Sequence, residues 1–483
     1  MHAMLFFDVN FLFLFLVPVV VISYSLVAAG FRSFAPWVAI GASLVFLGVF
    51  SWVSVAVAVL SLSINYAAGK YLLAHRRKKV LAGMIAANLA MLSYFKYSIL
   101  INGTFFHDEL PLIWRLALPL GISFYTFQQI AFLSDIYRGK TTSFSLRTYL
   151  LFKLFFPQLI AGPIVHFERV RASYERWPTF NPRSVRFGLL MISLGFLKKL
   201  AGDYFGTIAD ISFDHQAGLS MYGAWVGALA FSFQIYFDFS GYSDMAVGLA
   251  RLFGVSLPFN FNSPYKAKSI PDFWRRWHIT LSTWLRDYLY IPLGGSRKGR
   301  LRTFVALFMT MALGGLWHGA SWTFLAWGAA HGISQIVIRL VRVKLPAFFG
   351  RSLLLLFIML TWILFRSETF AGALDHYSAL FAINRVGVGV ELWRVVNLLV
   401  PVLPVPLTVI NRPEQVLQLV SMIGAAAVCI GSPNSQQISL WLAARRVAVL
   451  RFVDAPVLAT AIVIISLAFI SPDTSNAFIY FEF

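Results

Sequence analysis

The stretch PWVAIGASLVFLGVFSWVSVAVAVLSLSINYAAGKYL (36–72) contains a single charged residue, Lys70. It divides into two apolar runs, 36–52 and 53–72, close to the ~20 residues that a helix needs to cross a bilayer. Another apolar run precedes this stretch at 9–29, and further runs follow it at 80–100, 115–133, 187–207, 221–250, 303–317, 322–340, 352–366, 395–411, 416–431 and 455–471. These runs predict an all-α polytopic membrane protein with about 11–13 transmembrane or re-entrant helices.

Composition points to the same class of protein. Hydrophobic residues make up 59% of the chain and charged residues only 12%, with a mean hydropathy of +0.73. A soluble domain carries about 25% charged residues, so this chain has too little polar surface for one. The net charge of +20 does not indicate nucleic-acid binding. Lys and Arg stand in short clusters between apolar runs, as they do in cytoplasmic loops of membrane proteins.

Charge clusters also predict the orientation. The basic cluster HRRKK (75–79) should be cytoplasmic, which places the N-terminus on the periplasmic side and the acidic segment 107–109 outside. The basic loop 138–147 should then return inside. Asp8 and the lack of Lys or Arg before the first run predict a retained span instead of a cleaved signal. The single cysteine, Cys429, excludes a disulfide within the chain.

The apolar segment 148–165 has basic residues at both ends and contains FPQLIAGP (156–163). A segment that enters and leaves by the same face would explain both features. Irregular backbone at membrane depth is tolerated where it lines a cavity, so FPQLIAGP is expected to do so. One ordinary span, kinked at Pro157, is the alternative.

The most basic part of the chain is 251–302, with FWRRWHITLSTWLRDYLYIPLGG (273–295) inside it. Aromatic and leucine side chains recur at helical spacing there, which predicts an amphipathic helix at the cytoplasmic interface. His278 belongs to this helix. The cluster of guanidinium groups beside it favours an anionic donor, such as a phosphorylated coenzyme, although lipid-headgroup contact is an equal alternative. The donor-binding candidates are Trp274, Arg275, Arg276, Arg286 and Arg297.

GGLWHGASW (314–322) places His318 between two apolar runs, among glycines that permit close approach of the backbone. A neutral imidazole is a natural general base at physiological pH. A structural histidine bonded to backbone is an equally good interpretation of this segment alone. Trp317 and Trp322 bracket His318. A metal site is not expected, because the nearest histidine is His331 and no Cys, Asp or Glu lies close in sequence.

FDFSGYSDMA (237–246) carries two carboxylates, Asp238 and Asp244, in an apolar run. Either could orient a catalytic histidine or form a cavity wall. Buried hydrogen bonds that fix helix packing are the favoured interpretation. The chain has no G-x-S-x-G, Walker A or zinc signature, which disfavours a serine hydrolase. Intramembrane charges and broken helices suit a transporter too.

Several of these motifs together resemble the membrane-bound O-acyltransferase (MBOAT) family. They are GGLWHGASW, FWRRWHITLSTWLRDYLYIPLGGSRKG, FDFSGYSDMAVGLARLFG and FPQLIAGPI. LPLGISFYTFQQIAFLSDIYRG (118–139) and FIYFEF (478–483) are similar to the bacterial alginate O-acetylation branch. The resemblance is densest over 118–335, within a single membrane domain at 1–483, and it is weak over 370–475, among the C-terminal helices of 370–483.

The resemblance implies a ring of helices around a funnel or tunnel. It implies that His318 is catalytic and that His278 is the second functional position. It further implies that the protein takes an acetyl group from a cytoplasmic donor, acetyl-CoA, with no permanently bound cofactor. The group would pass across the bacterial inner membrane to periplasmic acetyltransferase partner proteins, with an exported polysaccharide such as alginate as the final acceptor.

The mechanism expected from these residues is acyl transfer with His318 as general base. The N–H of Trp317, the N–H of Trp322 or a backbone amide would stabilise the oxyanion. Because His278 falls in the basic interfacial region and His318 one apolar run further on, the two are expected at different depths. Two alternatives stay open: D-alanyl transfer to teichoic acid from a carrier protein, and a non-enzymatic transporter or assembly subunit.

Overall fold

The computed structural model describes residues 6, 11–105, 118–159, 162–179, 181–214, 219–341, 346–381 and 413–444. Throughout these residues the regular secondary structure is helical, which confirms the all-α prediction. The expected spans at 395–411 and 455–471 lie outside the described residues, as do the acidic segment 107–109 and FIYFEF (478–483).

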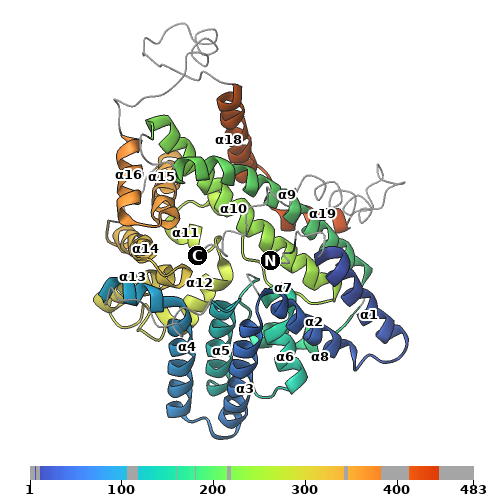
Figure 1. Ribbon diagram of the computed structural model, residues 1–483. Helices are drawn as coiled ribbons and strands as arrows, with labels where there is room; N and C mark the ends of the chain where they lie inside the picture. The colour runs from blue at the N-terminus through green and yellow to red at the C-terminus, as the bar shows by residue number, and fades with distance from the viewer. Residues whose placement is uncertain are drawn as a thin grey trace, which may run out of the picture.

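The amino-terminal third forms long helices that follow the predicted apolar runs. Figure 1 shows α3, α4 and α5 side by side. Arg76, in the left-handed conformation, ends α3 inside the basic cluster, so the charges lie at a turn between two spans. The elements are η1 (Phe11–Leu16), α1 (Val17–Ala28), α2 (Ala35–Phe50), α3 (Trp52–His75), α4 (Lys78–Phe105) and α5 (Ile122–Tyr137).

The segment around FPQLIAGP is broken into short pieces. Its elements are α6 (Leu146–Leu154), α7 (Phe156–Leu159) and α8 (Phe167–Glu175). Ser145 and Thr148 form a capping box at the start of α6. A helix of nine or four residues is far shorter than a bilayer crossing requires. The alternative of one kinked transmembrane helix is therefore wrong.

Helices α9 (Pro182–Asp214) and α10 (Met221–Leu252) form a long antiparallel pair in direct backbone contact. A Cβ on Gly195 would lie 2.7 Å from the carbonyl oxygen of Gly241, and one on Gly248 would lie 2.5 Å from that of Gly188. Small residues permit this approach, as they do in membrane helix pairs generally. The pair also buries ionic groups, which makes both helices less apolar than ordinary spans.

The remainder of the described chain surrounds the two short helices α11 and α12, which lie near the middle of the view in Figure 1. Helices α13 and α14 form a second close hairpin. The elements are η3 (Pro264–Lys266), α11 (Ile270–Trp274), α12 (Ile279–Leu285), η4 (Arg286–Tyr290), α13 (Arg300–His318), α14 (Trp322–Val341), α15 (Ala347–Arg366), α16 (Phe370–Leu380), α18 (Pro413–Gly431) and α19 (Ser435–Ala444).

The continuous amphipathic helix expected at 273–288 does not form. The chain breaks at His278, whose φ of 41° is left-handed, so α11 and α12 are separate helices. A left-handed residue cannot continue a right-handed helix. The helical spacing of the aromatic residues predicted one helix, but tertiary contacts at His278 determine the backbone conformation of that residue.

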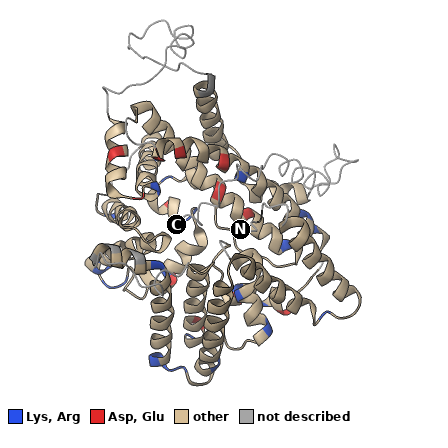
Figure 2. Ribbon diagram, in the orientation of Figure 1, with Lys and Arg blue, Asp and Glu red and all other residues tan. Residues whose placement is uncertain are grey.

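Six helices of the described chain are long and apolar enough to cross a membrane, and the bent pair α18–α19, with a 64° break, would make a seventh span. This supports a multi-pass membrane protein. Figure 2 shows few charged residues along the helices, with Lys and Arg at the turn between α3 and α4. The helices α5, α9 and α10 complete the fold around the site although they are shorter or more polar.

Candidate active site

His278 and His318 lie next to each other in the protein interior. Their ring centroids are 6.3 Å apart, and the two residues are 0% and 5% exposed. The expectation that they lie at different depths is wrong. The glycine-rich loop after η4, with positive φ at Gly294, Gly295 and Gly299, reverses the chain. Helix α13 therefore runs back toward α12, and its last residue, His318, lies beside His278.

The His278 turn is held by Asn260, a residue outside the motifs of the sequence. The Ile279 N–H donates to the Asn260 carbonyl (2.9 Å), and the Thr280 hydroxyl donates to the Asn260 side-chain oxygen (2.6 Å). Asn260 in turn donates to the Ser243 hydroxyl of α10 (3.2 Å). Because Asn260, Thr280 and Ser243 are all buried and hydrogen-bonded, the turn around His278 is rigidly specified.

The FPQLIAGPI segment reaches the same turn. The backbone N–H of Ile164 donates to the Thr280 hydroxyl at 3.0 Å, two residues from His278. A Cβ on Gly121 would lie 2.7 Å from the Leu159 carbonyl oxygen, so the start of α5 packs directly on α7. Three motifs that are far apart in sequence thus meet at one place. The cavity expected along FPQLIAGP stays a prediction.

His318 ends α13, and two side chains of α4 cap that end. Lys96 donates to the carbonyl oxygens of Trp317 (2.5 Å) and His318 (2.9 Å), while the Tyr97 hydroxyl donates to that of Leu316 (2.9 Å). Carbonyls at a helix C-terminus lack intrahelical partners, and a cation there is stabilising. Sequence reasoning missed Lys96. The signal was a lysine within the apolar run 80–100. A charged side chain is costly inside a membrane, so it usually has a specific partner or a function there.

Glycines bring α13 and α14 into backbone contact beside His318. A Cβ on Gly315 would lie 2.3 Å from the Phe324 carbonyl oxygen and 3.0 Å from Gly328 Cα. A Cβ on Gly319 would lie 2.1 Å from the Phe324 ring. The glycines of GGLWHG therefore serve helix approach, as the sequence predicted for them.

We expect Gly315→Ala to destabilise the fold by about 1–3 kcal/mol, because the added methyl must push α14 away from α13. Thermal unfolding of the purified protein in detergent measures this. Gly83→Ala is the matched control, since a Cβ on Gly83 has nothing within 4 Å. Equal unfolding temperatures for the two variants would contradict the close contact of α13 and α14.

A line of stacked aromatic rings leads away from the histidines. Trp317 lies 5.1 Å from His318 and stacks on Phe127 at 5.2 Å, and Phe127 stacks on Trp284 at 3.7 Å. Next in line is Tyr288, 5.5 Å from Trp284. The Tyr288 hydroxyl donates to Asp135 of α5 at 2.8 Å and lies 3.0 Å from His166 Nδ1. Stacked rings of this kind form a rigid apolar wall.

The two tryptophans that bracket His318 differ in what their N–H groups contact. Trp317 is buried, and its N–H has no hydrogen-bond partner among the described residues. Trp322 is 41% exposed, and its N–H donates to the Thr104 hydroxyl at 3.2 Å. Of the two candidate oxyanion donors, only Trp317 therefore has a buried N–H left over for a ligand.

Trp274 packs near the site through another histidine. Its N–H donates to His331 Nδ1 at 3.3 Å, and the other ring nitrogen of His331 lies 3.2 Å from the Thr361 hydroxyl. Trp327 stands between this histidine and His318, at 4.9 and 5.4 Å. Both nitrogens of His331 thus have partners, which gives it a structural role. Within the described ranges, no group of three or more His, Cys, Asp or Glu could hold a metal ion.

The four arginines predicted to bind a donor, Arg297 among them, are exposed or half-buried, and three of them lie beside a carboxylate. Arg275 and Arg276 contact Asp272 at 3.3 and 3.2 Å, and Arg286 contacts Asp287 at 2.7 Å. Partial burial raises the pKa of Asp272, but the Lys268 N–H and the Arg276 guanidinium outweigh it and hold the pKa below its usual value. The ionised carboxylate offsets part of the positive charge there.

Asp238 and Asp244 form buried ion pairs with α9. Asp238 lies 3.0 Å from Lys199, and Asp244 lies 2.6 Å from Lys198. Removing one partner of such a pair is costly because it leaves a buried charge. This geometry agrees with the packing role favoured for both carboxylates in the sequence.

The site environment keeps His278 uncharged. Burial lowers the pKa of His278 to about 3, since water is excluded from the imidazolium form. A neutral imidazole can accept or donate a hydrogen bond through different nitrogens. The arrangement therefore offers two imidazoles, one buried indole N–H and an apolar wall: parts suited to proton transfer beside a carbonyl group.

Comparison with known proteins identifies the family. The family model described as MBOAT, membrane-bound O-acyltransferase family, matches residues 104–366. The peptidoglycan O-acetyltransferase of Helicobacter pylori is 40% identical over 355 residues, which are 65% of this chain and 66% of that protein. The probable alginate O-acetylase AlgI of Azotobacter vinelandii is 42% identical over 62% of each chain.

A teichoic acid D-alanyltransferase of Streptococcus thermophilus is 33% identical over 45% of this chain and 56% of its own length. The chain spans about two thirds or less of the length of these relatives. The matched region contains both buried histidines, the Lys199–Asp238 pair and the FPQLIAGPI segment. The resemblance read from the motifs is thereby confirmed, and the chain belongs to the membrane-bound O-acyltransferase family.

Proposed function

We propose that this protein transfers an acetyl group across a bacterial inner membrane for the O-acetylation of an exported polysaccharide. The observation that carries the proposal is the buried pair of imidazoles, 6.3 Å apart, within the MBOAT fold. Relatives named for O-acetylation of alginate and of peptidoglycan, each at least 40% identical, support acetyl as the acyl group.

In the proposed reaction His318 is the general base. Its imidazole accepts the proton of the acceptor hydroxyl as that oxygen attacks the thioester carbonyl carbon. The tetrahedral intermediate carries its negative charge on the former carbonyl oxygen, toward which the buried Trp317 N–H would donate. The C–S bond then breaks, and the departing thiolate takes the proton back from the imidazolium. His278, whose ring centroid lies 6.3 Å from that of His318, orients one of the reacting groups by a hydrogen bond.

The donor in this proposal is acetyl-CoA, bound from the cytoplasm. Its phosphates would contact the basic surface of Arg275, Arg276 and Arg286, and its acetyl end would follow the aromatic wall toward His318. In the same proposal the N-terminus is periplasmic, as the basic cluster at 75–79 predicts. Periplasmic acetyltransferase partners carry the acetyl group to the polymer. The line of aromatic rings supports this path, because it runs from Trp317, beside His318, to Tyr288, whose ring lies 5.2 Å from the guanidinium group of Arg138.

The second candidate is D-alanyl transfer to teichoic acid, which a relative 33% identical over 45% of this chain supports. A deletion strain of the native host separates the candidates. We expect acetyl esters on the exported polymer to disappear while polymer yield stays normal, and the intact gene to restore them. Loss of D-alanyl esters with acetyl esters intact would favour the second candidate. Loss of polymer export itself would favour a transporter or assembly subunit.

A further inference from the structure

A cavity of about 630 Å³ lies on the outer side of α10, away from the histidines. Helices α9 and α10 form one wall and the bent pair α18–α19 forms the other. Tyr236 and Phe237 of α10 line it, whereas Phe239, two residues further along the helix, packs on His278 at 4.8 Å. Its volume falls within the ~300–1,000 Å³ range of small-molecule sites. The proposed acyl transfer makes no use of it.

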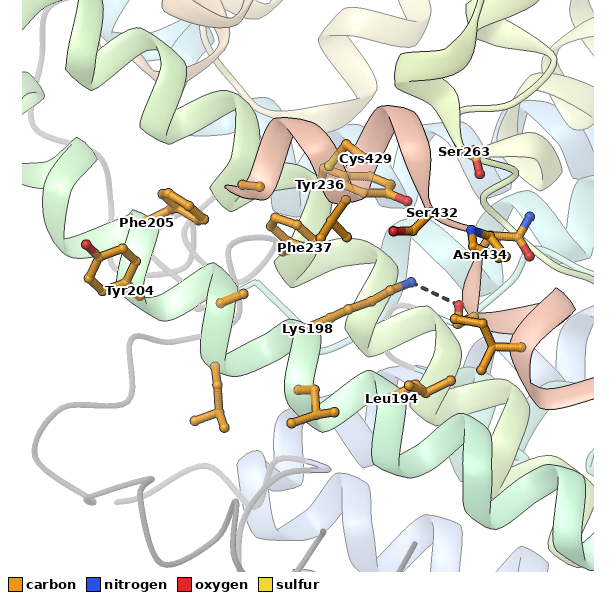
Figure 3. A pocket seen from close by; sticks show the side chains of 18 of the residues that line it. Leu194, Lys198, Tyr204, Phe205, Tyr236, Phe237, Ser263, Cys429, Ser432 and Asn434 are labelled. Atoms are coloured by element: carbon orange, nitrogen blue, oxygen red, sulfur yellow. Dashed lines mark hydrogen bonds between the residues drawn. The ribbon is translucent and has the colours of Figure 1, made fainter. Parts of the chain in front are cut away.

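The cavity is apolar along its length and polar at one end. Figure 3 shows Phe205 and Phe237 along the body, with Lys198 reaching toward Ser432 and Asn434. A hydrogen bond between Tyr204 and Ser421 (3.2 Å) joins α9 and α18 at the opposite end. At about 1.5 Å per residue, Lys198 and Tyr204 are about 9 Å apart along α9. The apolar body can therefore take a stretch of alkyl chain.

Beside the polar end, next to the lining residue Ser432 but outside the cavity wall, lies a second lysine, Lys266. Lys198 is neutralised by Asp244 at 2.6 Å and bonds Ser435 at 3.0 Å. Lys266 donates to the Ser432 carbonyl at 2.6 Å, and among the described residues no carboxylate lies within ion-pair distance of its ammonium group. The neighbouring Asn262 and Asn434 are hydrogen-bonded at an exposed position (3.0 Å). This end thus meets solvent or lipid headgroups.

We propose that this cavity binds an anionic phospholipid of the surrounding membrane. One acyl chain occupies the apolar body between α9 and α18, and the phosphate lies at the Lys266 end beside Ser432. The apolar wall favours an apolar occupant, the rim supplies hydrogen-bond donors, and Lys266, which has no carboxylate partner among the described residues, favours an anion. A phospholipid meets all three requirements. The site joins the C-terminal helices α18 and α19 to the helices of the matched family region.

Photo-crosslinking tests the proposal on the full-length protein in phosphatidylcholine vesicles. The probe is phosphatidylglycerol with a diazirine in one acyl chain, compared with phosphatidylcholine carrying the same chain. We expect about five-fold more crosslinking to peptides from 194–205 and 421–438 with the anionic probe, the size of one lysine contact to an anionic lipid. Lys266→Gln should reduce the anionic probe to the level of the zwitterionic one.

Two variants fill the cavity from opposite walls, Ala425→Phe on α18 and Ala201→Phe on α9. Each should abolish crosslinking of both probes. Gly424→Phe is the matched control, since a Cβ there has nothing within 4 Å and the residue is not in the cavity wall. Equal labelling of the folded wild type by both probes, or none by either, overturns the proposal. So does crosslinking that survives both filling variants.

Discussion

His318→Ala is expected to lower the rate of acetyl transfer by about 10²–10⁴-fold, the usual contribution of a general base. The variant keeps α13, because His318 is its last residue and alanine favours helix. Acetyl ester content of the polymer, compared at equal membrane levels of the two proteins, measures the effect. Initial rates with labelled acetyl-CoA in membrane vesicles give its size.

The matched control for that experiment is His376→Ala. His376 is also fully buried, and its ring lies 3.1 Å from the Ala224 carbonyl oxygen, between α16 and α10. Its loss costs packing and one hydrogen bond but touches nothing at the site. If both variants lose acetylation equally at equal protein levels, the effect belongs to stability and His318 is not the base. Unchanged acetylation in His318→Ala would remove it from the mechanism directly.

Lys96→Met should reduce kcat by about 10–100-fold while leaving KM for the acetyl donor nearly unchanged, because a displacement near 1 Å of a reacting group can cost about 10²-fold. The ammonium group of Lys96 holds the Trp317 and His318 carbonyls at 2.5 and 2.9 Å. Methionine keeps the length of the side chain but cannot donate. The end of α13, and the imidazole with it, would lose its fixed position.

Lys70→Met is the corresponding control on the neighbouring helix α3. Lys70 also donates to a backbone carbonyl, that of Phe144 at 3.0 Å, and lies over its ring at 4.6 Å. It has no contact with the histidines. A raised KM with normal kcat in Lys96→Met would assign this lysine to donor binding instead of positioning. Equal rates in the two variants would mean that the α13 cap does not influence His318.

Much of the fold could be predicted from apolar runs, because every hydrocarbon crossing needs one. The runs at 53–72, 303–317 and 322–340 correspond to α3, α13 and α14, with ends that agree within three residues. Prediction was weaker where periodicity was the only guide. The aromatic spacing of 273–288 indicated one helix, yet contacts with Asn260 hold His278 in a left-handed turn.

Candidate site residues divide in the same way. Histidine in an apolar, glycine-rich setting is rare enough that His318 could be singled out from its own neighbours. Lys96 could not be connected with His318 from the sequence, because 221 and 222 residues separate the lysine from the two carbonyl groups that it caps. Trp322 and Trp317 flank His318 alike in the sequence. In the structure the Trp317 ring lies 5.1 Å from that of His318, whereas the Trp322 N–H donates to Thr104.

The sequence by itself determined that this is a multi-pass helical membrane protein of the MBOAT family, because hydropathy and the residues of short motifs are local properties of the chain. Tertiary structure alone decided that His278 and His318 are adjacent and that Lys96 caps α13. It also decided that Asp238 and Asp244 belong to ion pairs with α9. The physical reason is chain reversal: a glycine turn and close helix packing set these distances, and neither is encoded in sequence spacing.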